Sequence, residues 1–401
     1  MPRDRAWDDA PRTCSRTGEQ PLKRYHIAHL AGDGIGPEVT TAGLTVLEAT
    51  ARRFGFAIEV TPSLIGRSAL AGEGSVLPRS TITACREADA VLLGPLRGDP
   101  TLPLIAPHHP LQGLTALYGW LGAHTNLRPI TLREPLLEQS PMKPEVIRGL
   151  DLVVVRDVAA GLPHGFPRAR ELHGGKRIAI NTAIYTDGEI RRVAEVAFHV
   201  AFHRRRHVTL AHQGKWLEIG QLWQEVTTEV SHRFPAVTSE ALDLDTCILE
   251  LAWNPSRFDV ILADSTSGEF LAAQAAGLSG SFALHPQAIL GEKTRGIFGP
   301  GHGTAPTLTG QGTANPAATI LGVAMMLGIA LEEHEAARAV RSATWEALVQ
   351  LRKPVDQCRT RETPLVTREM VEFICRHIET CPDAEVREPA LNPLAASGVI
   401  H

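Results

Sequence analysis

The sequence predicts an α/β fold in which short apolar strands alternate with longer helices. Apolar runs at residues 90–93 (AVLL), 152–155 (LVVV) and 259–262 (DVIL) are typical of strands buried on both faces. Residues 189–206 predict an amphipathic helix, because apolar side chains recur there at i, i+3, i+4 and i+7. Residues 316–330 predict an apolar helix that begins at a proline. Alternation of this kind indicates an α/β architecture.

The amino-terminal part of the fold is predicted by residues 25–54. Residues 25–30 (YHIAHL) predict a strand, residues 32–37 (GDGIGP) a turn and residues 39–54 a helix. The turn is not the GxGxxG dinucleotide fingerprint, since the third glycine is misplaced and a proline follows it. A strand-to-helix turn without a ligand explains it equally well.

The helix predicted over residues 189–206 also has charges suited to its two ends. It begins with Glu189 and ends with three consecutive arginines, residues 204–206. Acidic groups at the start and basic groups at the end are favoured by the helix dipole. We therefore interpret the arginine run as a helix end.

Length and composition exclude several classes of protein. A chain of 401 residues can form two or three domains, and a net charge of −4 without a basic tract does not indicate a nucleic-acid partner. No apolar run approaches the roughly 18 residues that a membrane span needs. The six cysteines form no CxxC pair, which is typical of reduced thiols. Residues 1–24 lack the apolar core of a signal peptide, so we expect a flexible extension and a cytoplasmic protein.

Several segments, taken together, resemble the β-decarboxylating dehydrogenases, the family of isocitrate and isopropylmalate dehydrogenases. They occur in the family's order and spacing: GDGIGPEV (32–39), ADAVLLG (88–94), TNLRP (125–129), DLVVVRD (151–157), NPSRFDVIL (254–262), HGTAP (302–306) and GQGTANPAATILGVAMML (310–327).

The resemblance implies a two-domain isocitrate/isopropylmalate dehydrogenase-like fold. One domain would combine residues 25–123 with residues 280–390, and residues 124–279 would form a central dimerisation and substrate domain, with a tail at 391–401. An arm near residues 165–185 would clasp a second subunit. A homodimer with active sites shared between subunits is therefore expected.

The family oxidises a 2-hydroxy acid with NAD(P) and then removes the carboxylate β to the new ketone. Substrate carboxylates are held by arginines, and the resemblance assigns this role to Arg128 and Arg156. Guanidinium groups bind carboxylates in a bidentate manner. A third family arginine is replaced by Tyr118. The expected ligand is a small anionic molecule.

The resemblance also implies a divalent metal held by three aspartates. The first matches Asp245, the second is Glu269 here, and the third is Ala273. Mg²⁺ prefers octahedral oxygen ligation with one or two carboxylates. Asp245 and Glu269 could still hold Mg²⁺ or Mn²⁺.

The family's proton-transfer residues are replaced in this chain. The lysine position holds Gln213, and the tyrosine position holds Pro163. Neither side chain can exchange a proton at neutral pH. His164 and His212 are possible substitutes because histidine titrates near neutrality, although a structural role is the alternative for each. Gln213, Asp245, His164 and His212 are thus the candidate catalytic residues.

Only part of the family's cofactor site is retained. His302, Gly303 and Asn315 match residues at the adenine end. Three acids expected near the ribose and nicotinamide are replaced; the residues at these positions are Gly299, Thr307 and Leu111. The cofactor is therefore unknown from sequence, and NAD binding is expected to be weak or absent.

These substitutions leave three functions open. The one favoured by the sequence is a repurposed enzyme of specialised metabolism that acts on an anionic small molecule without hydride transfer. The second is an NAD-dependent decarboxylating dehydrogenase of a 2-hydroxy acid with a rearranged site. The third is a non-catalytic subunit that partners an active paralogue.

Overall fold

The fold is built on one ten-stranded sheet with the order β2-β1-β3-β12-β11-β4-β5-β10-β8-β9. The computed structural model describes residues 22–98, 101–102, 106, 108–292, 294–358 and 362–380. Most of the extension expected at 1–24 and all of the tail expected at 391–401 lie outside these residues. The strands of the sheet are β1 (Arg24–Leu30), β2 (Ala57–Ser63), β3 (Ala90–Leu93), β4 (Ala123–Thr131), β5 (Asp151–Asp157), β8 (His207–His212), β9 (Thr238–Asp243), β10 (Val260–Ala263), β11 (Pro286–Gly291) and β12 (Thr294–Pro300).

The sheet is parallel towards both edges and antiparallel in the middle. On one side β1 pairs in parallel with β2 and β3, and on the other β10 pairs in parallel with β5 and β8. In the middle, β4 is antiparallel to both β5 and β11. The register of β4 and β5 places Arg128 opposite Val154 and Arg156 opposite Asn126. Because these positions are two apart on each strand, the two arginines lie on the same face of the sheet.

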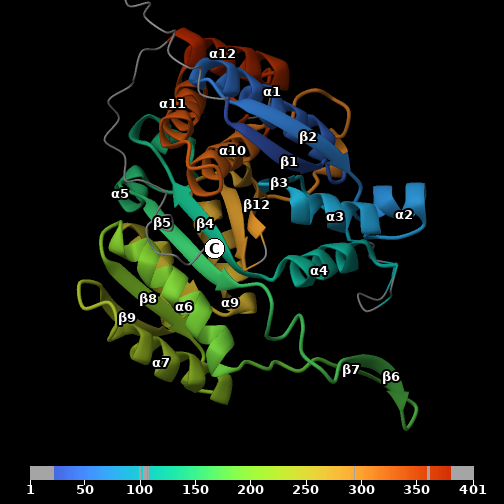
Figure 1. Ribbon diagram of the computed structural model, residues 1–401. Helices are drawn as coiled ribbons and strands as arrows, with labels where there is room; N and C mark the ends of the chain where they lie inside the picture. The colour runs from blue at the N-terminus through green and yellow to red at the C-terminus, as the bar shows by residue number, and fades with distance from the viewer. Residues whose placement is uncertain are drawn as a thin grey trace, which may run out of the picture.

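Helices cover both halves of the sheet (Figure 1). Around one half lie α1 (Gly36–Phe54), α10 (Ala317–Ile329), α11 (His334–Gln350) and α12 (Thr367–Thr380). Around the other lie α6 (Asp187–Phe202), α7 (Glu218–Ser231) and α9 (Ser265–Leu278), and α8 (Leu244–Trp253) packs against α9 and β9. The shorter helices are α2 (Arg67–Glu73), α3 (Arg79–Glu87), α4 (Pro110–Leu121) and α5 (Pro144–Ile147).

The structure confirms the α/β class and most of the predicted elements. Every residue of α10 is buried, as its unbroken apolar sequence predicts, because it packs against β11 and β12 on one side and α1 and α11 on the other. The glycine turn leads directly into α1, which begins at Gly36, three residues earlier than predicted. Among the described helices, none combines the length and apolarity that crossing a membrane requires.

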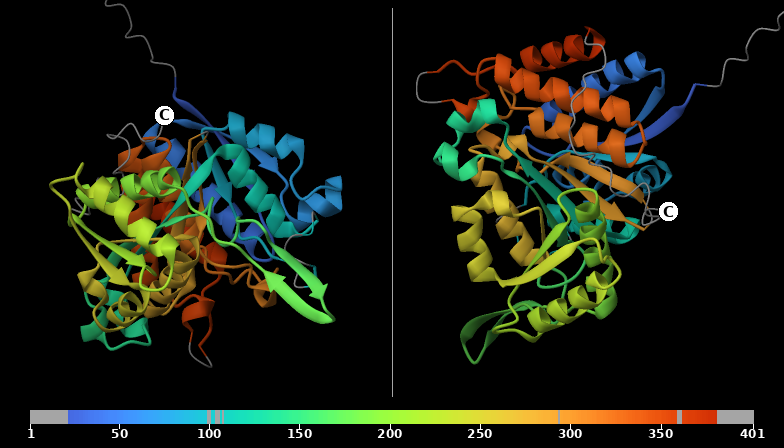
Figure 2. Two further views of the ribbon diagram at one scale, coloured as in Figure 1. Left: turned by 90° about the horizontal axis from the view of Figure 1, so that it is seen from below. Right: turned by 90° about the vertical axis from the view of Figure 1, so that its left-hand side faces the viewer.

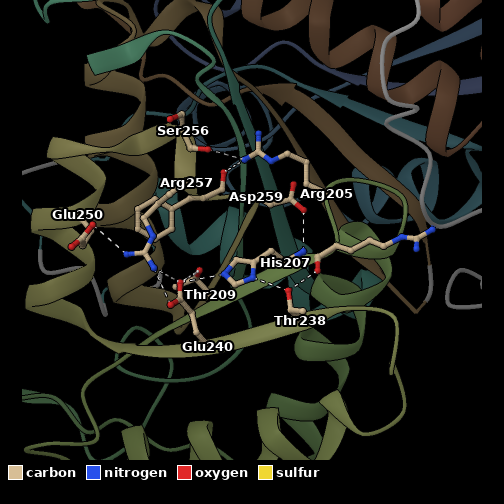
Figure 3. A network of polar contacts seen from close by, with 11 residues as sticks. Arg205, His207, Thr209, Thr238, Glu240, Glu250, Ser256, Arg257 and Asp259 are labelled. Carbon is tan, nitrogen blue, oxygen red and sulfur yellow. Dashed lines mark hydrogen bonds and ion pairs between the residues drawn. The ribbon is translucent and has the colours of Figure 1, made fainter. Parts of the chain in front are cut away.

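The prediction that the arginine run ends a helix is wrong. Helix α6 begins with a capping box between Thr186 and Glu189 but ends at Phe202. Arg204 instead forms a buried ion pair with Asp259, with 2.8 Å between Nε and Oδ1. Arg205 donates to the carbonyl of Phe258, in a network that continues to strand β9 (Figure 3). Arg204 and Arg205 thus contact residues just before β10 and do not lie in the last turn of α6.

A two-stranded hairpin projects from the body of the molecule (Figure 2). It consists of β6 (Ala169–His173) and β7 (Lys176–Ile180), within the range predicted for an arm. The division into a terminal and a central domain, and the pairing of this arm with a second subunit, stay predictions.

Candidate active site

Two arginines from adjacent strands converge on one carboxylate. Arg128 lies on β4, Arg156 on β5, and Glu269 near the start of α9, which packs against both strands. Arg156 Nη2 lies 2.6 Å from Glu269 Oε2. Arg128 Nη2 lies 3.4 Å from both carboxylate oxygens. The pair of residues predicted to bind substrate is therefore assembled around a carboxylate of the chain itself.

Both arginine side chains are mostly buried and are fixed by hydrogen bonds to backbone carbonyls. Their side chains are only 12% and 14% exposed, whereas that of Glu269 is 46% exposed. Arg128 Nη1 donates to the Gly301 carbonyl at 3.1 Å, and Arg156 Nη1 donates to the Ser265 carbonyl at 3.1 Å. The two guanidinium groups are therefore fixed by strands and backbone, while the carboxylate between them is the more accessible member.

The close approach of α9 to β5 depends on Gly268. A β-carbon at this position would lie 2.4 Å from Cβ of Arg156. Glycine therefore lets the first turn of α9 contact the arginine directly.

Tyr118 on α4 lies near both arginines. Burial raises the pKa of Tyr118 to about 12, against the opposing charges of Arg156 and Arg128. The phenol is consequently protonated at neutral pH and can donate a hydrogen bond. Tyr118, predicted to bind substrate, is thus close enough to both arginines for their charges to affect its pKa.

Gln213 begins a chain of polar contacts that the sequence did not predict. Its Nε2 donates to Ser267 Oγ at 3.1 Å, and that hydroxyl donates to Asp264 Oδ2 at 2.6 Å. Asp264 also caps α9 by accepting from the backbone of Thr266 and Ser267. The sequence DSTS after strand β10 could have predicted these polar contacts. It is also an ordinary helix start, so by itself it does not indicate a functional site.

The two predicted histidines differ in their surroundings. His212 is buried, and its Nδ1 accepts from the Gly214 amide at 2.9 Å, so it has a clear structural role. His164 lies in the loop after β5. Burial first, and then the charges of Arg168 and Arg156, lower its pKa. His164 is therefore a neutral imidazole that lies near one of the two site arginines.

Among the described residues of one chain, the predicted ligands do not come together as a divalent metal site. Asp245, in the first turn of α8, is exposed, and its Oδ1 accepts from the Thr246 amide. Glu269 is turned to two guanidinium groups that would repel a cation. In the part of the chain that the structure describes, no three His, Cys, Asp or Glu residues are grouped as a metal would require.

The three predicted cofactor residues lie together on one cavity of about 380 Å³. His302 and Gly303 come from the loop after β12, and Asn315 from the turn before α10. His302 Nδ1 contacts the Gly303 carbonyl at 2.8 Å, whereas its Nε2 is buried and has no hydrogen-bond partner among the described residues. Apolar walls come from Ile35 and Leu308. An unpartnered ring nitrogen beside apolar walls fits a flat heteroaromatic base.

Asp356 is a cavity residue that the sequence did not predict. It accepts from Asn315 Nδ2 at 3.1 Å and from Ser281 Oγ. Position 299, by contrast, has no room for the acid that the resemblance placed there. A β-carbon on Gly299 would lie 2.0 Å from the Leu93 carbonyl of β3. The polar rim of this cavity thus differs from the expected one.

The two strand arginines around one carboxylate, and the cavity lined by His302, Gly303 and Asn315, are the candidate site of this α/β protein. The family model for isocitrate/isopropylmalate dehydrogenase matches residues 26–374. The chain belongs to this family.

Relatives and solved structures agree with this assignment. The chain is 37% identical over 357 residues to a 3-isopropylmalate dehydrogenase of Halalkalibacterium halodurans, covering 89% of this chain and 98% of the relative. It is 42% identical over 327 residues to the 3-isopropylmalate dehydrogenase of Symbiobacterium thermophilum, covering 80% and 89%. The crystal structure of isocitrate dehydrogenase from Methylococcus capsulatus superposes with a TM-score of 0.78 at 28% identity, covering 88% and 99%.

These relatives contradict the function that the substitutions favoured. We expected a repurposed enzyme acting without hydride transfer. Relatives at 36–42% identity over most of the chain are instead named dehydrogenases. The expectation gave single replaced positions more weight than the match of the whole chain.

Proposed function

We propose that this protein is a nicotinamide-dependent dehydrogenase that oxidises and decarboxylates a 2-hydroxy acid, with 3-isopropylmalate as the first candidate substrate. The observation that carries the proposal is the convergence of Arg128 and Arg156 on one carboxylate position, at 3.4 Å and 2.6 Å. A fixed pair of guanidinium groups is a suitable receptor for a substrate carboxylate. The proposed reaction and substrate follow from the relatives, which are named 3-isopropylmalate dehydrogenase.

The cavity beside this site supports a dinucleotide cofactor. His302, Asn315 and Asp356 would hold the adenine end through hydrogen bonds, with Ile35 and Leu308 against the faces of the base. When bound, the nicotinamide would accept the hydride from the carbinol carbon. The expectation of weak NAD binding stays a prediction, because it depends on the ribose and nicotinamide positions.

Arg128 and Arg156 would bind the substrate carboxylate, and the protonated phenol of Tyr118 would donate a further hydrogen bond. During oxidation the hydroxyl proton needs an acceptor. The chain from Ser267 to Asp264 provides a carboxylate for this purpose, and Gln213 orients the serine. After loss of CO₂ the enol carbon needs a proton. His164 near Arg156 is the candidate that relays it from solvent, because its neutral imidazole can accept a proton at one ring nitrogen and donate one from the other.

We also propose that the protein forms a homodimer through α8 and α9. Trp253 and Leu249 on α8 and Phe270 on α9 are 70%, 51% and 64% exposed, although they are large and apolar. Adjacent exposed side chains of this kind mark an interface. Leu172 on the projecting hairpin is 72% exposed and is a second candidate contact. Light scattering coupled to gel filtration should give twice the chain mass, and a monomer would contradict the proposal. The cytoplasmic location also stays a prediction.

The decisive experiment measures turnover. The purified protein is incubated with 3-isopropylmalate and NAD or NADP, in parallel with and without Mg²⁺ or Mn²⁺. We expect formation of reduced cofactor and CO₂ that requires both substrates. Asp264→Asn should retain the helix cap through its amide oxygen but lose most of the activity. No reduced cofactor with 3-isopropylmalate, isocitrate or tartrate would refute the proposal.

A further inference from the structure

Glu269 occupies the place where a ligand carboxylate would bind. Its carboxylate contacts both arginines, one at 2.6 Å and the other at 3.4 Å. The Nη1 group of each arginine donates to a backbone carbonyl, Gly301 for Arg128 and Ser265 for Arg156, and the Nε group of each is buried. An incoming carboxylate would therefore seek the Nη2 donors that Glu269 already uses.

Because of its charges and burial, the position between the two arginines can hold only one carboxylate in short contact with Arg156. Two guanidinium groups face one carboxylate, so the cluster has a net positive charge and attracts a further anion. A second carboxylate on the same donors would lie against that of Glu269, and like charges at such a distance repel strongly where solvent is partly excluded. Both carboxylates cannot hold the short contact with Arg156 at the same time.

Of the three side chains in the cluster, that of Glu269 can most easily move out to solvent. Its side chain is 46% exposed, compared with 12% and 14% for the arginines. It is the fifth residue of α9 and has three rotatable side-chain bonds. Moving it to solvent breaks contacts with the arginines but opens no cavity in the core.

We propose that Glu269 is a displaceable internal carboxylate that occupies the substrate-carboxylate site of the free protein and competes with the ligand. Binding of an anionic ligand then requires exchange of one carboxylate for another. The affinity for a carboxylate is set by the difference between two ion pairs and not by the full strength of one. This inference rests on the proposed function only in assuming that the site takes a carboxylate.

The test is a calorimetric titration with malate, a 2-hydroxy dicarboxylic acid, in the presence of EDTA. Glu269→Gln removes the competing charge at almost constant volume. We expect the dissociation constant for malate to fall at least tenfold, equivalent to about 1.4 kcal/mol. Glu229→Gln is the matched control, because Glu229 pairs with Arg191 on the surface at 2.7 Å and should leave malate binding unchanged. Equal, weaker or undetectable malate binding by Glu269→Gln would overturn the inference.

Thermal unfolding gives a second readout that depends on the same charges. Without Glu269 the two arginines are largely buried and lack their counter-ion, so the variant should melt at a lower temperature than the parent without added anions. Malate should restore the variant and raise its melting temperature more than that of the parent. An identical response of both proteins would contradict the inference. Neither measurement needs turnover, so inactivity with 3-isopropylmalate, isocitrate and tartrate would refute the proposed function and leave this inference standing.

Discussion

Replacing Arg156 is the most direct test of the anion site. Its Nη2 makes the shortest contact with the carboxylate position, at 2.6 Å, and its side chain is 14% exposed. A hydrogen bond to a charged group contributes roughly 1.5–3 kcal/mol. Arg156→Ala should therefore raise the dissociation constant for 3-isopropylmalate by about tenfold to a hundredfold. Glu269, left with the more distant Arg128, would add repulsion to this loss.

The lysine variant separates charge from geometry. Arg156 uses Nη1 for the Ser265 carbonyl and Nη2 for the carboxylate. Lysine has a single ammonium group that cannot span both positions. Arg156→Lys should consequently recover less than half of the lost binding free energy.

Isothermal titration and kcat/KM should both record these losses. Arg191→Ala is the matched control, since Arg191 forms a surface ion pair with Glu229, and it should bind ligand like the parent. Circular dichroism should show that each variant retains its secondary structure, because Glu269 can turn to solvent. The reasoning is refuted if Arg156→Ala binds 3-isopropylmalate within twofold of the parent.

Three further predictions concern stability and the cofactor. Asp259→Ala removes one of the two carboxylates that pair with buried Arg204, the other being Asp151 at 3.0 Å, and should cost roughly 1.5–3 kcal/mol in urea unfolding; an unchanged free energy of unfolding would contradict the buried pair. Burial raises the pKa of Asp157 from 3.8 to about 6. The folded state therefore holds a proton that the unfolded state releases, and stability falls as pH rises from about 4 to 6. Asp157→Asn should remove this penalty, up to about 3 kcal/mol at neutral pH, and a gain that does not grow with pH would refute it. His302→Ala should weaken NAD binding about fivefold in calorimetry, whereas unchanged binding would place the base elsewhere.

The sequence by itself determined the class of fold and the family. The runs AVLL and LVVV form β3 and β5 because a strand covered on both faces needs apolar residues at every position. The apolar sequence of α10 likewise requires burial on all sides. Arg128 and Arg156 could be predicted as a pair, because both lie in motifs with specific family spacing. These features depend on local composition and on short segments.

Tertiary structure decided which side chains meet. Glu269 was predicted to be a metal ligand, but its carboxylate faces Arg128, a residue 141 positions away in the sequence. Asp356 joins the cofactor cavity through Asn315, 41 positions away. Helix α6 ends at Phe202, and Arg204, which follows it, forms a buried pair with Asp259, 55 positions away. Each of these contacts forms between segments brought together by the sheet order, and no local pattern records which charged partner is nearest once the chain has folded.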